Sequence, residues 1–132
     1  MAESPSSPTP TPAAGDRMRI EHMLRAARDA QAVLGSRDEQ ALTSDMVRSR
    51  ALVNCFTEIG EAASRLTLAG RASVGTLPWR EIVGMRNIVV HVYWGIDLVE
   101  LIKTTREDLP PLIMALEEAL ARWPEPPKVG KL

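Results

Sequence analysis

The residues that could do chemistry gather in one stretch, Trp79 to Asp97, which reads WREIVGMRNIVVHVYWGID. At about 100° per residue, this stretch is predicted to form a helix with an ordinary core stripe on one face. The opposite face carries a cation, an amide, an imidazole and a phenol, because residues three, four or seven positions apart lie close together on a helix. Such a mixture among apolar side chains indicates a face that meets a ligand or a partner. These four residues are Arg86, Asn87, His91 and Tyr93.

An arginine and a histidine together suit phosphodiester cleavage without a metal ion. Histidine can move a proton near neutral pH. A guanidinium binds phosphate through two parallel hydrogen bonds and stabilises the charge that develops on it. On RNA the 2′-hydroxyl would be the nucleophile, and a cyclic 2′,3′-phosphate would be the product. The bare spacing of Arg86 and His91 is common in helices, so from this pair alone surface ion-pairing residues are the simpler interpretation.

The composition excludes several classes of protein. The chain has 132 residues and a formal net charge of −1, so one domain is expected, and any nucleic-acid binding needs a local basic site. One cysteine and two histidines offer no zinc site, and no cofactor is expected. No apolar run approaches the roughly 20 residues of a membrane span. No secretory signal is expected at the N-terminus, and a cytoplasmic location fits best.

The elements that must hold the stretch are all predicted to be helices. The fold class is therefore all-α, a compact up-and-down bundle of four to five helices. A first helix should start near Asp16, whose side chain could cap it, and run to about Leu34 before Gly35 ends it. His22 points away from its core stripe, and a solvated surface histidine is a simpler interpretation than a catalytic one. The stripe consists of Ile20, Met23, Leu24, Ala27 and Leu34.

A long second helix is predicted to begin near Ser44 or Asp45, to continue to about Ala69 and to end at Gly70. Cys55 lies in the middle of its core face, where a packed thiol is a simpler interpretation than a reactive one. The core face consists of Ala51, Leu52, Cys55, Phe56, Ile59, Ala62, Ala63 and Leu66.

Three local patterns belong to the same region. Gly60 interrupts an otherwise strong helix, where glycine costs about 1 kcal/mol relative to alanine. A close helix crossing at Gly60 would explain it. Glu61 and Arg65 have the spacing and order of a favourable helical ion pair. Ser36 with Glu39 resembles a capping box ahead of a short helical turn.

The remaining elements are read from their breaking and capping residues. Residues 71–77 are predicted to form a loop, and Pro78 suits the first turn of the helix that contains Arg86. Gly95 is a natural residue to end that helix. Asp97 with Glu100 makes another capping box and starts the fourth helix.

The last part of the chain divides into a helix and a tail. Pro110 and Pro111 are expected to break or restart the fourth helix, and a last helix follows. The expected organisation is a disordered Pro/Ser/Thr-rich tail at 1–15, a helical domain at 16–123 and a short tail at 124–132.

The run LPWREIVGMRNIVVHVY, with IGEA at 59–62, resembles the HepT family of HEPN-domain toxins. These proteins share an Arg-x4-His-x-Tyr motif, usually preceded by Gly-Met and with a polar residue directly after the arginine. Trp79 and Ile82 fit the lead-in to the motif, and Asp97 fits the acidic position after it. The resemblance covers roughly residues 17–120. The residues that match the motif are Gly84, Met85, Arg86, Asn87, His91 and Tyr93.

The resemblance implies an all-α, HEPN-like bundle that forms a homodimer, with the motifs of two protomers meeting in a shared cleft. It implies a metal-independent endoribonuclease toxin and a nucleotidyltransferase antitoxin of the MntA type, which attaches AMP to the motif tyrosine. By match, Arg86 and His91 would be catalytic, Asn87 supporting, and Tyr93 the modified residue. RNA would be the substrate.

The residues themselves add a reason for the dimer. Acid–base cleavage needs one group to take a proton and another to give one, and a twofold interface supplies a second His91. Two alternatives remain open from the sequence. One is a catalytically inert HEPN partner, or substrate-binding module, of a nucleotidyltransferase. The other is a plain helical dimerisation module.

Overall fold

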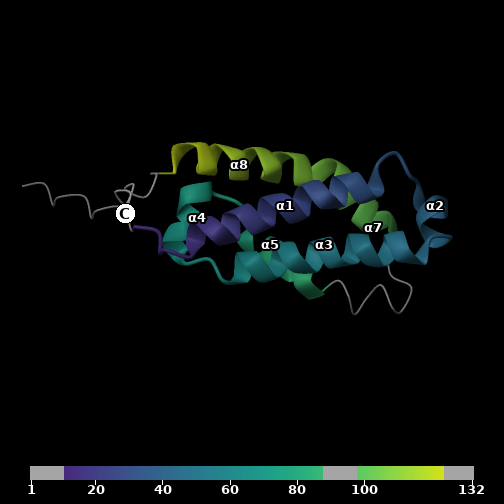
Figure 1. The fold of residues 1–132 in the computed structure, drawn as a ribbon, viewed down its shortest axis with the longest axis horizontal. Coiled ribbons are helices and arrows are strands. Elements are labelled where there is room, and N and C mark those ends of the chain that lie inside the picture. The colour runs from purple at the N-terminus through teal and green to yellow at the C-terminus, as the bar shows by residue number, and fades with distance from the viewer. Residues whose placement is uncertain (1–10, 88–97, 124–132) are drawn as a thin grey trace, which may run out of the picture.

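The computed structural model describes residues 11–87 and 98–123, and all regular secondary structure in those two segments is helical (Figure 1). The predicted all-α class is confirmed. The elements in order are α1 (Asp16–Leu34), α2 (Glu39–Thr43), α3 (Met46–Ser64), α4 (Leu68–Val74), α5 (Trp79–Gly84), the 3-10 turn η1 (Met85–Asn87), α7 (Leu98–Lys103), the π-helical turn η2 (Thr104–Asp108) and α8 (Leu109–Arg122).

Three long helices form the body of the molecule. In Figure 1, α1 lies between α8 and α3, and α1 and α3 run antiparallel along most of their length. Every residue of the core stripe predicted for the first helix is buried, and so is every residue of the stripe predicted for the second helix apart from the half-buried Ala51. The largest fully buried side chains come mostly from these three helices: Phe56, Ile20, Met23, Leu34, Leu52, Ile59, Leu109 and Leu116. Among the described residues, no helix is long and apolar enough to cross a membrane.

Asp16 begins α1 as predicted, but it does not cap the helix. The N-cap residue is Gly15, which makes no side-chain cap. The Asp16 carboxylate is buried and accepts hydrogen bonds from the Ala13 N–H (2.8 Å), the Thr67 N–H (3.0 Å) and the Thr67 hydroxyl (2.5 Å). A Cβ at Gly70 would lie 2.5 Å from the Asp16 Cγ, so only glycine fits there. Asp16 thus ties the start of α1 to the segment after α3.

This buried carboxylate makes the stability depend on pH. Burial disfavours the charged form, but the three hydrogen bonds and the charge of Arg19 hold the pKa of Asp16 below its ordinary value. A carboxyl whose pKa is lower in the folded state stabilises the protein above its unfolded pKa, which is about 3.9. That stabilisation is lost as the pH falls through the folded pKa.

We expect Asp16→Asn to lower the free energy of unfolding by about 2 kcal/mol at pH 7, because hydrogen bonds to a buried charge are lost. The difference from wild type should shrink below about pH 4. Urea denaturation of both proteins, at pH 7 and again below about pH 4, measures the difference in the free energy of unfolding. Asp38→Asn is the matched control, since Asp38 is exposed and asparagine caps a helix equally well. Equal stability of Asp16→Asn and wild type at pH 7 would contradict the assignment.

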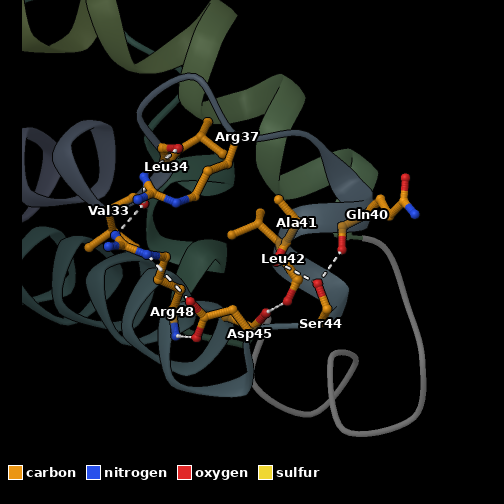
Figure 2. A network of polar contacts seen from close by, with 10 residues as sticks. Val33, Leu34, Arg37, Gln40, Ala41, Leu42, Ser44, Asp45 and Arg48 are labelled. Carbon is orange, nitrogen blue, oxygen red and sulfur yellow. Dashed lines mark hydrogen bonds and ion pairs between the residues drawn. The ribbon is translucent and has the colours of Figure 1, made fainter.

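The connection from α1 to α3 satisfies the helix ends with side chains (Figure 2). Asp38, not the predicted Ser36, caps α2, because its carboxylate accepts the Ala41 N–H at 2.9 Å. Asp45 caps α3 by accepting the Arg48 N–H at 3.0 Å. The Arg48 guanidinium in turn donates to the Val33 carbonyl at the end of α1, at 3.2 Å.

The predicted second helix is in fact two helices. It ends at Ser64, and Thr67 caps a separate helix, α4, by accepting the Gly70 N–H at 3.0 Å. The break occurs here because the Thr67 hydroxyl also donates to Asp16, from a distant part of the chain. The prediction of a loop over 71–77 was correspondingly wrong, since α4 continues to Val74.

Helical structure continues without a gap from α7 through η2 into α8, so the two prolines do not separate two helices. Pro110 and Pro111 lie in the first turn of α8 and lack the N–H groups that a regular helix would use there. They follow the π-helical turn η2, in which the buried Thr105 hydroxyl donates to the Leu101 carbonyl at 2.7 Å. The predicted cap at Asp97, the helix end at Gly95 and most of both predicted tails fall outside the described residues.

Candidate functional site

The helix that was predicted to carry the motif begins where expected. α5 starts at Trp79 after Pro78, and the indole N–H of Trp79 donates to the Gly75 carbonyl at 3.3 Å. The guanidinium of Arg71 lies 5.7 Å from the centre of the Trp79 ring, within the range of a cation–π contact. Arg71 also donates to the Ala63 carbonyl on α3 at 3.2 Å. These contacts fix the start of α5 against the end of α3.

The first two motif residues lie on a tighter turn than predicted. The α-helix ends at Gly84, and Met85, Arg86 and Asn87 form the 3-10 turn η1, which has about three residues per turn instead of 3.6. Met85 packs partly against the core, whereas Arg86 and Asn87 are exposed. His91 and Tyr93, the other two predicted site residues, lie outside the described residues.

Gly60 allows α3 to approach this turn closely. A Cβ built on Gly60 would lie 2.8 Å from the Cβ of Arg86 and 2.8 Å from the carbonyl oxygen of Val83. Real side chains essentially never come so close, so the crossing requires glycine. The predicted close helix crossing at Gly60 is therefore confirmed. The partner in that crossing is the turn that carries Arg86.

Glu61, the next residue on α3, forms an ion pair with the turn. Its Oε1 lies 3.5 Å from Nη1 of Arg86. The expected helical pair between Glu61 and Arg65 is not formed, because the Glu61 side chain reaches across to η1 instead. The two side chains are 47% and 41% exposed, and pairs this accessible stabilise a fold by about 0–1 kcal/mol. An anionic ligand could therefore compete for the guanidinium.

Sequence reasoning missed the role of Glu61. The available signal was the IGEA run at 59–62, in which a glycine and an acid follow each other on a strong helix. This pattern shows that a close contact is needed on that face of the helix. It does not show that Arg86 makes the contact, because the pairing depends on how α5 folds back onto α3.

An open groove of about 530 Å³ runs between α1 and α3 and reaches this ion pair through Glu61. His22 lies in the groove and is exposed, as predicted for a solvated histidine. The groove is lined by Met18, Arg19, His22, Arg25, Asp29, Glu58, Glu61, Ala62 and Arg65.

Cys55 takes no part in the site. Its thiol is buried in the face of α3 that packs on α1, as predicted. Burial, together with the negative charges of Asp29 and Glu58, raises the pKa of Cys55 to about 11. The thiol is therefore almost entirely protonated near neutral pH and chemically inert.

Comparison with known proteins points to one family. The family model described as Ribonuclease HepT-like matches residues 23–119. A protein of Methanocaldococcus jannaschii, provisionally named an RNase, is 36% identical over 76 residues, which cover 58% of this chain and 69% of that protein. A protein of Caldanaerobacter subterraneus, also provisionally named an RNase, is 28% identical over 106 residues, which cover 80% of this chain and 95% of that protein.

A third relative carries the family name itself. The probable ribonuclease HepT of Thermococcus cleftensis is 36% identical over 62 residues, and the match spans 47% of this chain and 56% of that protein. No solved structure matches the chain.

Proposed function

This chain belongs to the HepT-like ribonuclease family, and we propose that it is a metal-independent endoribonuclease of the toxin type in which Arg86 and His91 cleave RNA. One observation carries the proposal. Arg86 lies on an exposed turn whose backbone packs closely against Gly60 of α3. Its guanidinium forms only a weak, displaceable ion pair with Glu61. This is a suitable arrangement for receiving a phosphate.

The proposed reaction is an in-line transesterification. His91 takes the proton of the 2′-hydroxyl, and the 2′-oxygen bonds to phosphorus as the bond from phosphorus to the 5′-oxygen breaks. A protonated acid gives a proton to the departing 5′-oxygen, so the products are a 2′,3′-cyclic phosphate and a 5′-hydroxyl. Arg86 stabilises the negative charge that builds on the phosphate oxygens. Asn87 follows Arg86 on the same exposed turn, and we assign it a supporting polar role.

We propose that the working unit is a homodimer in which two motifs share one cleft. One protomer offers a single motif histidine, whereas acid–base cleavage needs a second proton carrier, which the His91 of a second copy can supply. Sedimentation that finds only monomers at the concentrations where the protein cuts RNA would contradict this arrangement.

A nucleotidyltransferase of the MntA type is the proposed antitoxin, and it would silence the ribonuclease by attaching AMP to Tyr93. A bound adenylate would add an anionic phosphate and bulk to the motif and so block RNA. We expect the intact mass to rise by one or more AMP units after co-expression with this partner, with the added mass mapping to Tyr93. Tyr93→Phe protein should stay unmodified and active. Silencing of Tyr93→Phe by adenylylation elsewhere would contradict the placement.

The alternative is a catalytically inert partner module for the nucleotidyltransferase. Incubation of the purified chain with RNA in EDTA separates the two functions. Cleavage that disappears in Arg86→Ala supports the ribonuclease. A stable complex with the nucleotidyltransferase, without any cleavage, supports the inert module.

A further inference from the structure

The groove between α1 and α3 carries cationic side chains that the proposed cleavage step does not use. Arg19, Arg25 and Arg65 line it, and none of the three forms an ion pair with a carboxylate among the described residues. Three acids line the groove as well. Glu61 pairs with Arg86, whereas Glu58, which accepts a hydrogen bond from the neutral Asn54 side chain at 3.0 Å, and Asp29 are anionic groups within the lining. The charge of Arg19 also acts on Asp16, so Arg25 and Arg65, which form no ion pair among the described residues, are the cations that the groove offers to an anion.

The charges are unevenly distributed along the groove. Asp16 at the start of α1 touches Thr67 just beyond the end of α3, so the two helices run antiparallel past each other. Arg19 and His22 therefore lie at the end of the groove that contains Arg65, whereas Asp29 lies toward the other end. Glu61 joins the basic end directly to Arg86.

We propose that this groove binds the sugar–phosphate backbone of the RNA strand next to the cleaved phosphate. The inference rests on the proposed ribonuclease function and adds a binding surface to it. Arg19 and Arg25 are six residues apart, or about 9 Å along the helix axis, so the groove can contact more than one phosphate. Glu61 lines the groove and also pairs with Arg86, so this one residue connects the groove to the candidate site. An RNA strand bound in the groove would have a phosphate within reach of Arg86 at the point where it leaves the groove.

The residues that line the groove also predict which parts of the RNA strand they contact. Nonspecific single-strand binding combines phosphate contacts with base stacking on aromatic rings. Among the residues that the structure describes, the nine that line the groove include no aromatic ring of phenylalanine, tyrosine or tryptophan. Contacts to the backbone should therefore dominate, and binding should depend steeply on salt and weakly on base sequence.

The test compares Arg25→Gln/Arg65→Gln with Arg28→Gln in the full chain. Arg25 and Arg65 are exposed groove residues that make no ion pair among the described residues, so their loss should not unfold the protein. Arg28 lies on the same helix as Arg25 but points toward α8, where it pairs with Glu117 at 3.0 Å. The probes are single-stranded RNAs of about 15 and about 4 nucleotides, a range that brackets the site sizes of single-strand grooves. Binding is measured in a His91→Ala background, so that the RNA stays intact.

We expect the double variant to bind the longer RNA about 10-fold more weakly, and the slope of log affinity against log salt to fall by about 1.4. With His91 restored, KM should rise more for the longer RNA than for the short RNA. Arg28→Gln should behave as wild type in every assay.

Any of the following results would overturn the proposal. If the double variant binds the longer RNA as wild type does, or Arg28→Gln weakens it equally, the groove is not the binding surface. If the double variant alters the sedimentation coefficient, the groove is an interface between copies of the chain. If one of these results is obtained but wild type still cuts the short RNA, the proposed ribonuclease function survives and only the assignment of the groove fails. Wild type that neither binds nor cuts RNA overturns both.

Discussion

Replacement of Arg86 by alanine is expected to lower the rate of RNA cleavage by about 10²–10³-fold, the usual loss when one group that stabilises transition-state charge is removed. The fold should not change, because the side chain is 41% exposed and its ion pair with Glu61 contributes little. Initial rates on a labelled RNA, together with thermal unfolding of both proteins, measure the two effects separately.

Two companion variants sharpen this prediction. Arg80→Ala removes an exposed arginine from α5 and should leave the cleavage rate near that of wild type. Arg86→Lys keeps the charge but not the planar fork that binds phosphate through two hydrogen bonds, so an intermediate loss is expected. Full activity in Arg86→Ala would remove Arg86 from the mechanism.

The second large effect is expected from Gly60→Ala. The new methyl group would overlap the carbonyl oxygen of Val83 and the Cβ of Arg86, each 2.8 Å away. Alanine improves helix propensity by about 1 kcal/mol, but overpacking against backbone costs about 1–3 kcal/mol, so a net loss of stability is expected. Relief of the overlap would shift η1. A displacement of about 1 Å at a catalytic group can cost about 100-fold in rate.

Kinetics and chemical denaturation of Gly60→Ala measure both consequences. Gly84→Ala is the stability control, because a Cβ there meets no described atom within 4 Å and the substitution should be neutral or slightly stabilising. A Gly60→Ala protein with wild-type stability and wild-type activity would show that the close crossing does not position Arg86.

The helical periodicity of the sequence was enough to predict the long elements. The bounds of α1 were predicted from Asp16 and Gly35, and the buried stripes of α1 and α3 from the spacing of apolar residues. The break between α3 and α4 could not be predicted in this way. It depends on Thr67, which caps α4 and also donates to Asp16 at the start of α1, and apolar spacing does not reveal a contact between residues so far apart in the sequence.

In the candidate site, too, features of the local sequence were predicted and contacts between distant residues were not. The motif identified Arg86 and Asn87 as candidates, and Gly60 was correctly expected to mark a close crossing. The 3-10 turn and the pairing of Glu61 with Arg86 were not predicted, because both result from α5 packing on α3. The roles of His91 and Tyr93 remain predictions from the motif.

The central claim is that RNA is cut by its own 2′-hydroxyl without a metal ion. Its most direct test gives the purified chain, in EDTA, a single-stranded RNA and the same RNA carrying one 2′-deoxynucleotide at the cleaved position. The products are then identified by mass. The account predicts that the RNA is cut to a 2′,3′-cyclic phosphate and a 5′-hydroxyl, and that the deoxy position is spared. Cleavage that requires a divalent cation, or that leaves a 5′-phosphate, would contradict it.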